Sequence, residues 1–147
     1  MLMNKLSIIV RNSRIFSTRA LQEYGLGHPE QMILMFLFQN NNVNQDTIAK
    51  KFNIDKGTIA KTCSKLESKG YIERITNPSN QREKIINLCE KGRGMFVIMG
   101  KVLEDWNNCI FQGLSEEDIN KLNEIISKME FSSTKVINKE GGVDYAE

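Results

Sequence analysis

The sequence has very little of what most enzymes and metal sites require. Its 147 residues include one histidine, His28, so a histidine-rich metal centre is excluded. A His-Glu-x-x-His motif, a phosphate-cradling glycine loop and a glycine-flanked nucleophilic serine are all missing, and one histidine severely limits catalytic triads. We therefore expect no enzymatic activity, no cofactor and no metal. His28 itself precedes Pro29 at a helix start, where a surface or capping role is favoured over ligand binding.

Cysteine is also scarce, and this bears on the redox environment. Cys63, Cys89 and Cys109 are an odd number at wide spacings. Such a set fits reduced thiols better than a disulfide framework or a zinc site. We interpret the three as small core residues. For Cys63, which shares a helix side with apolar residues, a buried structural thiol is favoured over a redox sensor.

Long apolar runs are missing as well. No stretch approaches the roughly 18 residues that a membrane span needs, and the N-terminal residues lack the cleavage site of a signal peptide. With 40% hydrophobic and 26% charged residues, the composition is that of a soluble protein. The length suits one compact domain, or one domain with an appended interaction region. We expect a cytoplasmic protein.

The net charge is small, but its distribution is informative. The whole chain carries +2, which does not by itself indicate a nucleic-acid partner. Residues 43–94 contain eleven Lys or Arg against six Asp or Glu, a balance of +5, so the remaining residues sum to −3. This asymmetry favours a central DNA-binding region between acidic flanks, although a solvated surface also reaches such a balance by chance.

Residues 53–70, NIDKGTIAKTCSKLESKG, can form one short helix with two different faces. Asp55 can cap its start, and Gly70 can close its end with a positive φ. At 3.6 residues per turn, one side carries Ile59, Cys63 and Leu66 and packs inward. The other side carries Thr58, Lys61, Thr62, Lys65 and Lys69. Lysines and threonines on a capped helix suit the major groove of DNA, whereas the alternative is an ordinary solvated surface.

The segments before this helix predict the first part of a helix-turn-helix. Residues 4–24 are one amphipathic helix, and Pro29 begins a second helix that is apolar on nearly all sides. Asn44 can cap a short third helix in which Ile48, Ala49 and Phe52 share one side. This third helix, a short turn and the helix of residues 55–69 together form the pattern of a helix-turn-helix.

The segments after Gly70 predict a wing. Residues 71–76 and 84–88 favour β-structure, and residues 77–82 between them favour a turn. A hairpin directly behind a helix-turn-helix is a wing, and its tip carries Arg82. We expect Arg82 to enter a minor groove, the alternative being a free charge on a disordered turn. Arg74 and Lys84 are expected to touch phosphate, if they contact DNA at all.

Helical periodicity returns after the wing. Residues 95–110 carry an apolar stripe, Gly113 ends that helix, and Ser115 with Asp118 can cap the last one. The first helix and the last two carry more apolar surface than a winged domain of about fifty residues can cover, so two subunits should pair through them. The predicted fold is mainly α with a small β-hairpin wing. Residues 1–38 and 95–131 are dimerisation helices, residues 39–94 the winged helix-turn-helix and residues 132–147 a flexible tail.

The order and spacing of these landmarks resemble the MarR family of bacterial winged-helix regulators over about residues 6–129. The landmarks are Gln31, Leu34 and Leu37 in the second helix, Ile48-Ala49-Lys50 in the third, the run from Leu66 to Arg74, and the wing end from Ile86 to Gly92. The resemblance implies a dimer held by its terminal helices, with the helix of residues 55–69 in the major groove. It also implies release from DNA by a small aromatic or anionic ligand bound between the dimerisation and DNA-binding regions.

Position by position, the resemblance assigns the DNA contacts. Arg82 looks like the wing arginine of the family's Asp-x-Arg motif. The expected base and phosphate contacts on the helix are Lys56, Thr58, Lys61, Thr62 and Lys65. Two positions depart from the family pattern: Asn80 replaces the acid that orients the wing arginine, and Cys89 follows Leu88 where threonine is common. Without a charged partner, Arg82 should be held less firmly. The peroxide-sensing branch of the family uses a reactive cysteine near the start of the protein. Here no cysteine precedes Cys63, which disfavours that branch.

The sequence thus predicts a homodimeric, sequence-specific DNA-binding transcriptional regulator that acts as a repressor on a pseudo-palindromic operator. The alternative is a winged-helix module that binds only protein. Binding to duplex DNA that weakens steeply with salt separates the two.

Overall fold

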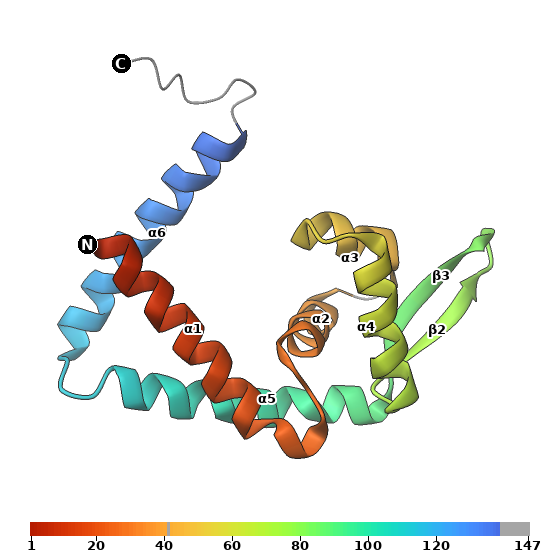
Figure 1. The fold of residues 1–147 in the computed structure, drawn as a ribbon, viewed down its shortest axis with the longest axis horizontal. Helices are drawn as coiled ribbons and strands as arrows, with labels where there is room; N and C mark the ends of the chain where they lie inside the picture. Colours follow the sequence, from red (N-terminus) through yellow and green to blue (C-terminus); the bar gives the residue numbers. More distant parts are fainter. Residues whose placement is uncertain (41, 139–147) are drawn as a thin grey trace. The chain divides into compact units, whose positions relative to one another are not determined.

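The computed structural model describes residues 1–40 and 42–138 of the chain (Figure 1). It divides into two compact units, residues 1–106 and 107–147. The helices are α1 (Leu2–Ala20), the 3₁₀ turn η1 (Gln22–Tyr24), α2 (His28–Gln39), α3 (Gln45–Phe52), α4 (Lys56–Ser68), α5 (Glu90–Ile110) and α6 (Glu116–Asn138). The strands are β1 (Val43–Asn44), β2 (Ile72–Asn77) and β3 (Asn80–Leu88). The predicted fold class, mainly helical with a small β wing, is confirmed.

Helices α3 and α4 form the helix-turn-helix, and side-chain caps set where each begins. The Asn44 side chain accepts a hydrogen bond from the Thr47 backbone N–H at 2.7 Å. Asp55 does the same for the Thr58 N–H at 2.8 Å, as the sequence predicts. Asn53 ends α3 at φ +52°, a conformation that asparagine tolerates better than most residues. Both predicted caps are therefore confirmed.

The core of the first unit gathers around α2. Ile33, Leu34 and Leu37 of this helix are buried, which confirms its prediction as the core helix. Helix α4 packs inward through the predicted residues Ile59, Cys63 and Leu66, all buried. The other buried apolar side chains of this cluster include Leu21, Leu26, Ile48, Tyr71, Ile72, Ile86 and Met95. Burial of one face of α4 thus fixes which face the helix presents outward.

The wing is the outer part of a three-stranded antiparallel sheet with strand order β1-β3-β2. Figure 1 shows β2 and β3 extending from the end of α4 as a long hairpin. The predicted hairpin is confirmed, but its strands reach closer to the tip, where Asn77 pairs with Asn80. Strand β1 was not predicted, because its two residues are held by β3 through the pairs Val43 with Ile86 and Asn44 with Ile85. No local pattern of that length indicates a strand.

The terminal helices differ from the prediction at their ends. Helix α1 stops at Ala20, and η1 follows it, because Leu21 turns into the core with 1% of its surface exposed. The predicted capping box of α6 is confirmed: Asp118 accepts a hydrogen bond from the Ser115 N–H at 3.1 Å, and the Asp118 N–H donates to the Ser115 hydroxyl at 3.1 Å. Helix α6 continues to Asn138. The prediction that helical structure ends at Phe131 was therefore wrong, and residues 139–147 of the predicted tail lie outside the described residues.

The cysteines lie in three different environments. Cys63 is buried as predicted, and burial raises the pKa of its thiol to about 11. Cys89 is half-buried and Cys109 is exposed, so the prediction of a core position was wrong for Cys109. Within residues 1–40 and 42–138, no cluster of three or more His, Cys, Asp or Glu side chains is placed to hold a metal ion. Across the same residues, no helix is both long enough and apolar enough to cross a membrane.

Candidate nucleic-acid interface

The outward face of α4 is the first part of the candidate interface. Thr58, Lys61 and Lys65 are exposed there, as the sequence predicts. Ser64 is exposed between them and was missed, although it follows Lys61 by three residues and therefore shares its face. This face carries amines and hydroxyls, which donate to phosphate oxygens and to acceptors on base edges.

Thr62 does not belong to this face. Only 7% of its surface is exposed, and its hydroxyl donates to the Thr58 carbonyl oxygen of its own helix at 3.0 Å. A threonine can bury its methyl group among apolar neighbours while its hydroxyl bonds back to the preceding turn. The prediction that Thr62 lies on the exposed face was therefore wrong, because the buried side of α4 is wider than the arc of Ile59, Cys63 and Leu66 indicates.

The lysines of α4 differ in how they are engaged. The Lys56 ammonium lies 2.8 Å from the Asp46 carboxylate, on the first turn of α3. The Lys65 ammonium lies 3.4 Å from Glu30, a carboxylate on α2 that is only 5% exposed. Lys61 forms no ion pair or hydrogen bond within the part of the chain that the structure describes. Lys61 is thus the α4 cation whose charge is most available to a partner.

Two hydrogen bonds join Thr58 and Asp55 at the start of α4. The Thr58 hydroxyl donates to Asp55 Oδ2 at 2.6 Å, while the Thr58 N–H donates to Oδ1. The hydroxyl hydrogen bond, followed by the backbone one, lowers the pKa of the Asp55 carboxyl below its usual range. Because the Thr58 hydrogen is engaged, its exposed oxygen is left mainly as an acceptor.

Arg74 is engaged inside the protein. Its guanidinium donates to Glu67 Oε2 through Nε at 2.9 Å and Nη2 at 2.5 Å, and its backbone N–H donates to Oε1 at 3.2 Å. The hydrogen bond from Arg74 lowers the pKa of the Glu67 carboxyl, and the same bond raises the pKa of Arg74. Such a two-point contact ties β2 to the last turn of α4. This geometry favours a structural role for Arg74 over the predicted phosphate contact.

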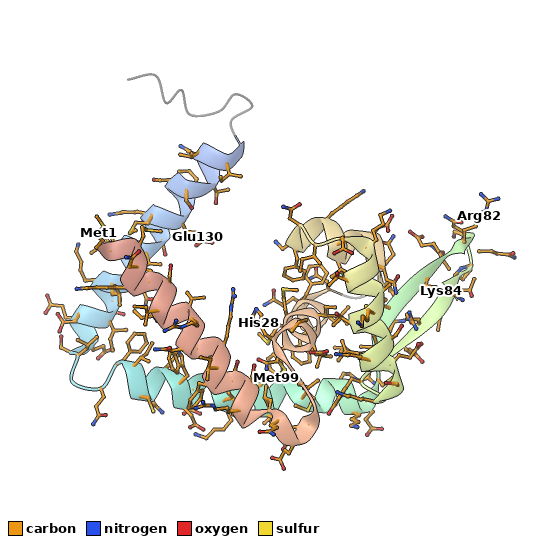
Figure 2. All side chains as sticks on the ribbon, in the orientation of Figure 1. Met1, His28, Arg82, Lys84, Met99 and Glu130 are labelled. Atoms are coloured by element: carbon orange, nitrogen blue, oxygen red, sulfur yellow. The ribbon has the colours of Figure 1, made fainter. Side chains whose placement is uncertain are left out.

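The wing is the second part of the candidate interface. Figure 2 shows Arg82 at the outer end of the wing, with Lys84 further back along it. Both side chains are exposed, and the Lys84 ammonium donates to the Thr76 hydroxyl at 2.8 Å. The Asn80 side chain accepts from the backbone N–H of Arg82 at 3.2 Å and so acts on the backbone that carries the arginine. The predicted tip cation is thus in place.

Sequence reasoning missed two acids that hold this interface together. Glu30 reaches Lys65 across 35 residues of sequence, and Glu83 accepts hydrogen bonds from Asn44 and Asn77. The signal for Glu83 is visible in the sequence: it is an acid between Arg82 and Lys84, in a segment expected to approach a polyanion. A carboxylate at such a position is unfavourable for DNA binding unless it has a structural task.

A cavity of about 470 Å³ lies among α1, α2 and α5. Figure 2 marks two of its lining residues, His28 and Met99. Its lining is mostly apolar and includes Phe16, Leu21, Met32, Met35, Phe96, Met99, Leu103 and Trp106, with Ser13, Arg14, Ser17, His28 and Gln31 as polar members. Burial, and then the charge of Arg14, lower the pKa of the His28 imidazole. An apolar cavity with a few polar groups is typical of a small-molecule site.

The fold, the capped helix and the basic wing define a winged helix-turn-helix protein. The model of the MarR family matches residues 26–84. The chain is 26% identical over 112 residues to the HTH-type transcriptional regulator BilQ of Clostridioides difficile (strain CD3), covering 76% of each chain. It superposes on the crystal structure of MarR with a TM-score of 0.84 at 30% identity, covering 92% of each chain.

A second similar structure is a putative MarR family transcriptional regulator from Listeria monocytogenes complexed with 26mer DNA. It has a TM-score of 0.77 at 21% identity and covers 97% of both chains. This chain belongs to the MarR family, and it is a winged-helix transcriptional regulator. Because the family consists of transcriptional regulators and a similar structure is complexed with DNA, the alternative of a module that binds only protein is not favoured.

Proposed function

We propose that this chain is a homodimeric repressor that acts in the cytoplasm and binds a pseudo-palindromic operator in duplex DNA. Helix α4 enters the major groove of each half-site, and Arg82 enters the adjacent minor groove. The observation that carries this proposal is the outward face of α4, where Lys61, Ser64 and Lys65 are exposed on a helix fixed by its cap. The DNA-bound relative from Listeria has the same fold, which supports the mode of binding.

Exposed apolar residues on the terminal helices support the dimer. Helix α1 exposes Ile8, Ile9, Val10 and Ile15, helix α5 exposes Phe96, Val97 and Leu103, and helix α6 exposes Leu122, Ile125, Ile126 and Phe131. Each is a large hydrophobic side chain with 37% or more of its surface exposed. Several large apolar side chains exposed on the same helix are typical of an interface between subunits. We therefore assign residues 1–38 and 95–131 to dimerisation and residues 39–94 to DNA binding.

A salt titration of DNA binding tests the proposal and counts the cations involved. Duplexes are first selected from fragmented genomic DNA by the wild-type protein, and their affinity is then measured by fluorescence anisotropy at increasing salt. If Lys61, Arg82 and Lys84 each neutralise one phosphate charge, a dimer neutralises six, and log K falls with log salt at a slope of about −5. If Lys56, Lys65 and Arg74 also leave their carboxylates and each neutralises a phosphate, the dimer neutralises twelve, and the slope is about −11. No duplex binding at low salt would refute the proposal.

Two single variants locate the contacts. Lys61→Ala and Arg82→Ala should each weaken operator binding by about tenfold or more, while the melting temperature and the dimer stay unchanged. Lys101→Ala is the matched control, because Lys101 on α5 is 61% exposed and pairs with Glu104 and Asp105 on its own helix. It should bind as the wild type does. If a variant of Lys61 or Arg82 binds like the wild type, that residue is not a contact.

A second proposed function is release of the operator by a small aromatic or anionic effector in the α1, α2 and α5 cavity. The supporting observation is that α2 has two roles. On one side His28, Gln31 and Met35 line the cavity, and on the other Glu30 holds Lys65 of α4. A ligand that moves α2 therefore acts on α4 directly. Calorimetry with phenolic acids, followed by operator titration, tests this: binding heat with loss of operator affinity is expected, and neither effect would contradict it.

A further inference from the structure

The segment that carries Arg82 is not held by the strand ladder. Thr76 pairs with Lys84 and Asn77 pairs with Asn80, so residues 81–83 lie opposite no partner residue on β2. Such a bulge leaves its residues without the regular cross-strand hydrogen bonds. Something other than the ladder must therefore fix the position of Arg82.

Side-chain hydrogen bonds of Glu83 supply that fixation. One carboxylate oxygen accepts from the Asn44 amide, and the other accepts from the Asn77 amide at 2.5 Å. The side-chain Oδ1 of Asn44 accepts a hydrogen bond from the Thr47 N–H of α3, and Oδ1 of Asn77 accepts one from the Ser79 N–H at the wing tip at 3.0 Å. A continuous chain of hydrogen bonds thus runs from the first turn of α3, through Glu83, to the tip.

We propose that Glu83 is a positioning residue that fixes the wing on helix α3 and so places Arg82 for DNA. This inference rests on the proposed function, since it assigns a task within that interface. Without Glu83, the position of Arg82 in the wing would depend on Asn80, an uncharged side chain that accepts a hydrogen bond from the Arg82 backbone N–H. Both asparagines meet Glu83 with N–H groups, so a carboxylate, which only accepts, is the side chain that satisfies both.

The sign of one substitution separates positioning from simple electrostatics. Glu83→Gln keeps the shape of the side chain and removes a negative charge from the wing. Electrostatics alone predicts tighter DNA binding, because repulsion between Glu83 and phosphate is lost. Positioning predicts weaker binding, because the glutamine amide must face the amide of Asn44 or Asn77, donor against donor.

The experiment measures anisotropy on the duplex that the wild type selects from genomic fragments. Glu83→Gln should weaken binding about tenfold, with the melting temperature unchanged, and should have no further effect in an Arg82→Ala background. Glu73→Ala is the control for charge, since Glu73 is an exposed acid on β2. It should leave affinity unchanged or raise it. In the free protein, the NMR order parameters of the backbone amides of residues 80–83 should fall from about 0.85 to below about 0.6 in Glu83→Gln and stay unchanged in Glu73→Ala.

Three results would overturn the inference. Unchanged or tighter binding by Glu83→Gln means that Glu83 acts only as a charge. An equal loss of affinity in the Arg82→Ala background means that Glu83 does not act through Arg82. If the wild type binds no duplex at all, the proposed function fails, and the order parameters alone decide: unchanged order parameters at residues 80–83 then exclude positioning by Glu83.

Discussion

Gly92 brings helix α5 against the backbone of Tyr71, three residues after the end of α4, and replacing it should be unusually costly. A Cβ atom at this position would lie 2.0 Å from the Tyr71 carbonyl oxygen and 3.0 Å from its carbon. Ordinary contacts between carbon and oxygen are about 3.3 Å or longer, so Gly92→Ala requires a shift of about 1 Å. Tyr71 directly follows Gly70, which ends α4 at φ +74°. The substitution therefore pushes on the junction between α4 and the wing.

The obstacle at Gly92 is backbone, which cannot rotate away like a side chain. The same Tyr71 oxygen accepts the Cys89 N–H at 3.0 Å, so moving it also strains a hydrogen bond. Overpacking costs about 1–3 kcal/mol, and a lost hydrogen bond costs about 1 kcal/mol more. We expect Gly92→Ala to lower the free energy of unfolding by about 3 kcal/mol, which is about 10 °C in melting temperature for a chain of this length.

Urea and thermal unfolding followed by circular dichroism measure this effect. Gly94→Ala is the matched control, since Gly94 lies on the same helix and a Cβ there meets nothing within 4 Å. That variant should gain about 0.5–1 kcal/mol, because alanine favours helix over glycine. If Gly92→Ala has the same free energy of unfolding as Gly94→Ala, the close approach to Tyr71 does not constrain the fold, and the prediction is refuted.

Three further predictions concern thiols, pH and assembly. At pH 8 a thiol reagent should modify the exposed Cys109 quickly and the buried Cys63 only on unfolding. A pKa of about 11 leaves only about one part in a thousand of the Cys63 thiol ionised at that pH. Mass spectrometry of the labelled native protein checks this. The pKa of Asp55 in the folded protein lies below its usual 3.8, so the ionised carboxylate stabilises the fold above that value. The free energy of unfolding of the wild type should therefore exceed that of Asp55→Asn at pH 6. The difference should vanish as the pH falls through the folded pKa, as denaturant titrations at each pH will measure. Ile9→Glu places a charge on an exposed apolar position of α1 and should shift the protein from dimer to monomer in analytical ultracentrifugation, whereas an unchanged dimer would exclude that position from the interface.

The features that sequence reasoning predicted are those with local causes. Asn44 and Asp55 cap helices through residues three positions later, and the inward side of α4 follows its own helical period. Contacts between distant segments could not be predicted in this way. Glu30 meets Lys65 across 35 residues, and Asn44 meets Glu83 across 39. Periodicity carries no information about which distant side chain will arrive beside a given residue.

The error at Thr62 has the same origin. Helical spacing orders residues around an axis, but the width of the buried side depends on which helices and strands pack there. Here that side extends to Thr62, which is buried, and leaves Ser64 exposed. The end of α6 was missed for a different reason. Ser133 and Thr134 break the apolar stripe, yet their hydroxyls donate to the Glu130 carbonyl oxygen and are satisfied within the helix.

The intramolecular contacts of the basic residues around α4 change how the interface should be understood. The Lys91 ammonium donates to the Lys69 carbonyl oxygen at 2.8 Å, and the Lys69 ammonium donates to the Gly25 carbonyl oxygen. Together with Lys56 on Asp46 and Arg74 on Glu67, these contacts fix α4 at both ends before any DNA arrives. Ordering a helix in advance lowers the entropy cost of binding.

The two halves of the interface are therefore prepared to different degrees. Helix α4 presents Lys61 and Ser64 on a frame that folding has already set, so its contacts depend little on further ordering. The wing presents Arg82 on a bulge that the strand ladder does not fix. Several ion pairs and caps fix α4 in place, whereas the wing is fixed by the hydrogen bonds of one carboxylate, Glu83. For this reason a change of a single atom in Glu83 should affect DNA binding more than the loss of a whole lysine elsewhere on the surface.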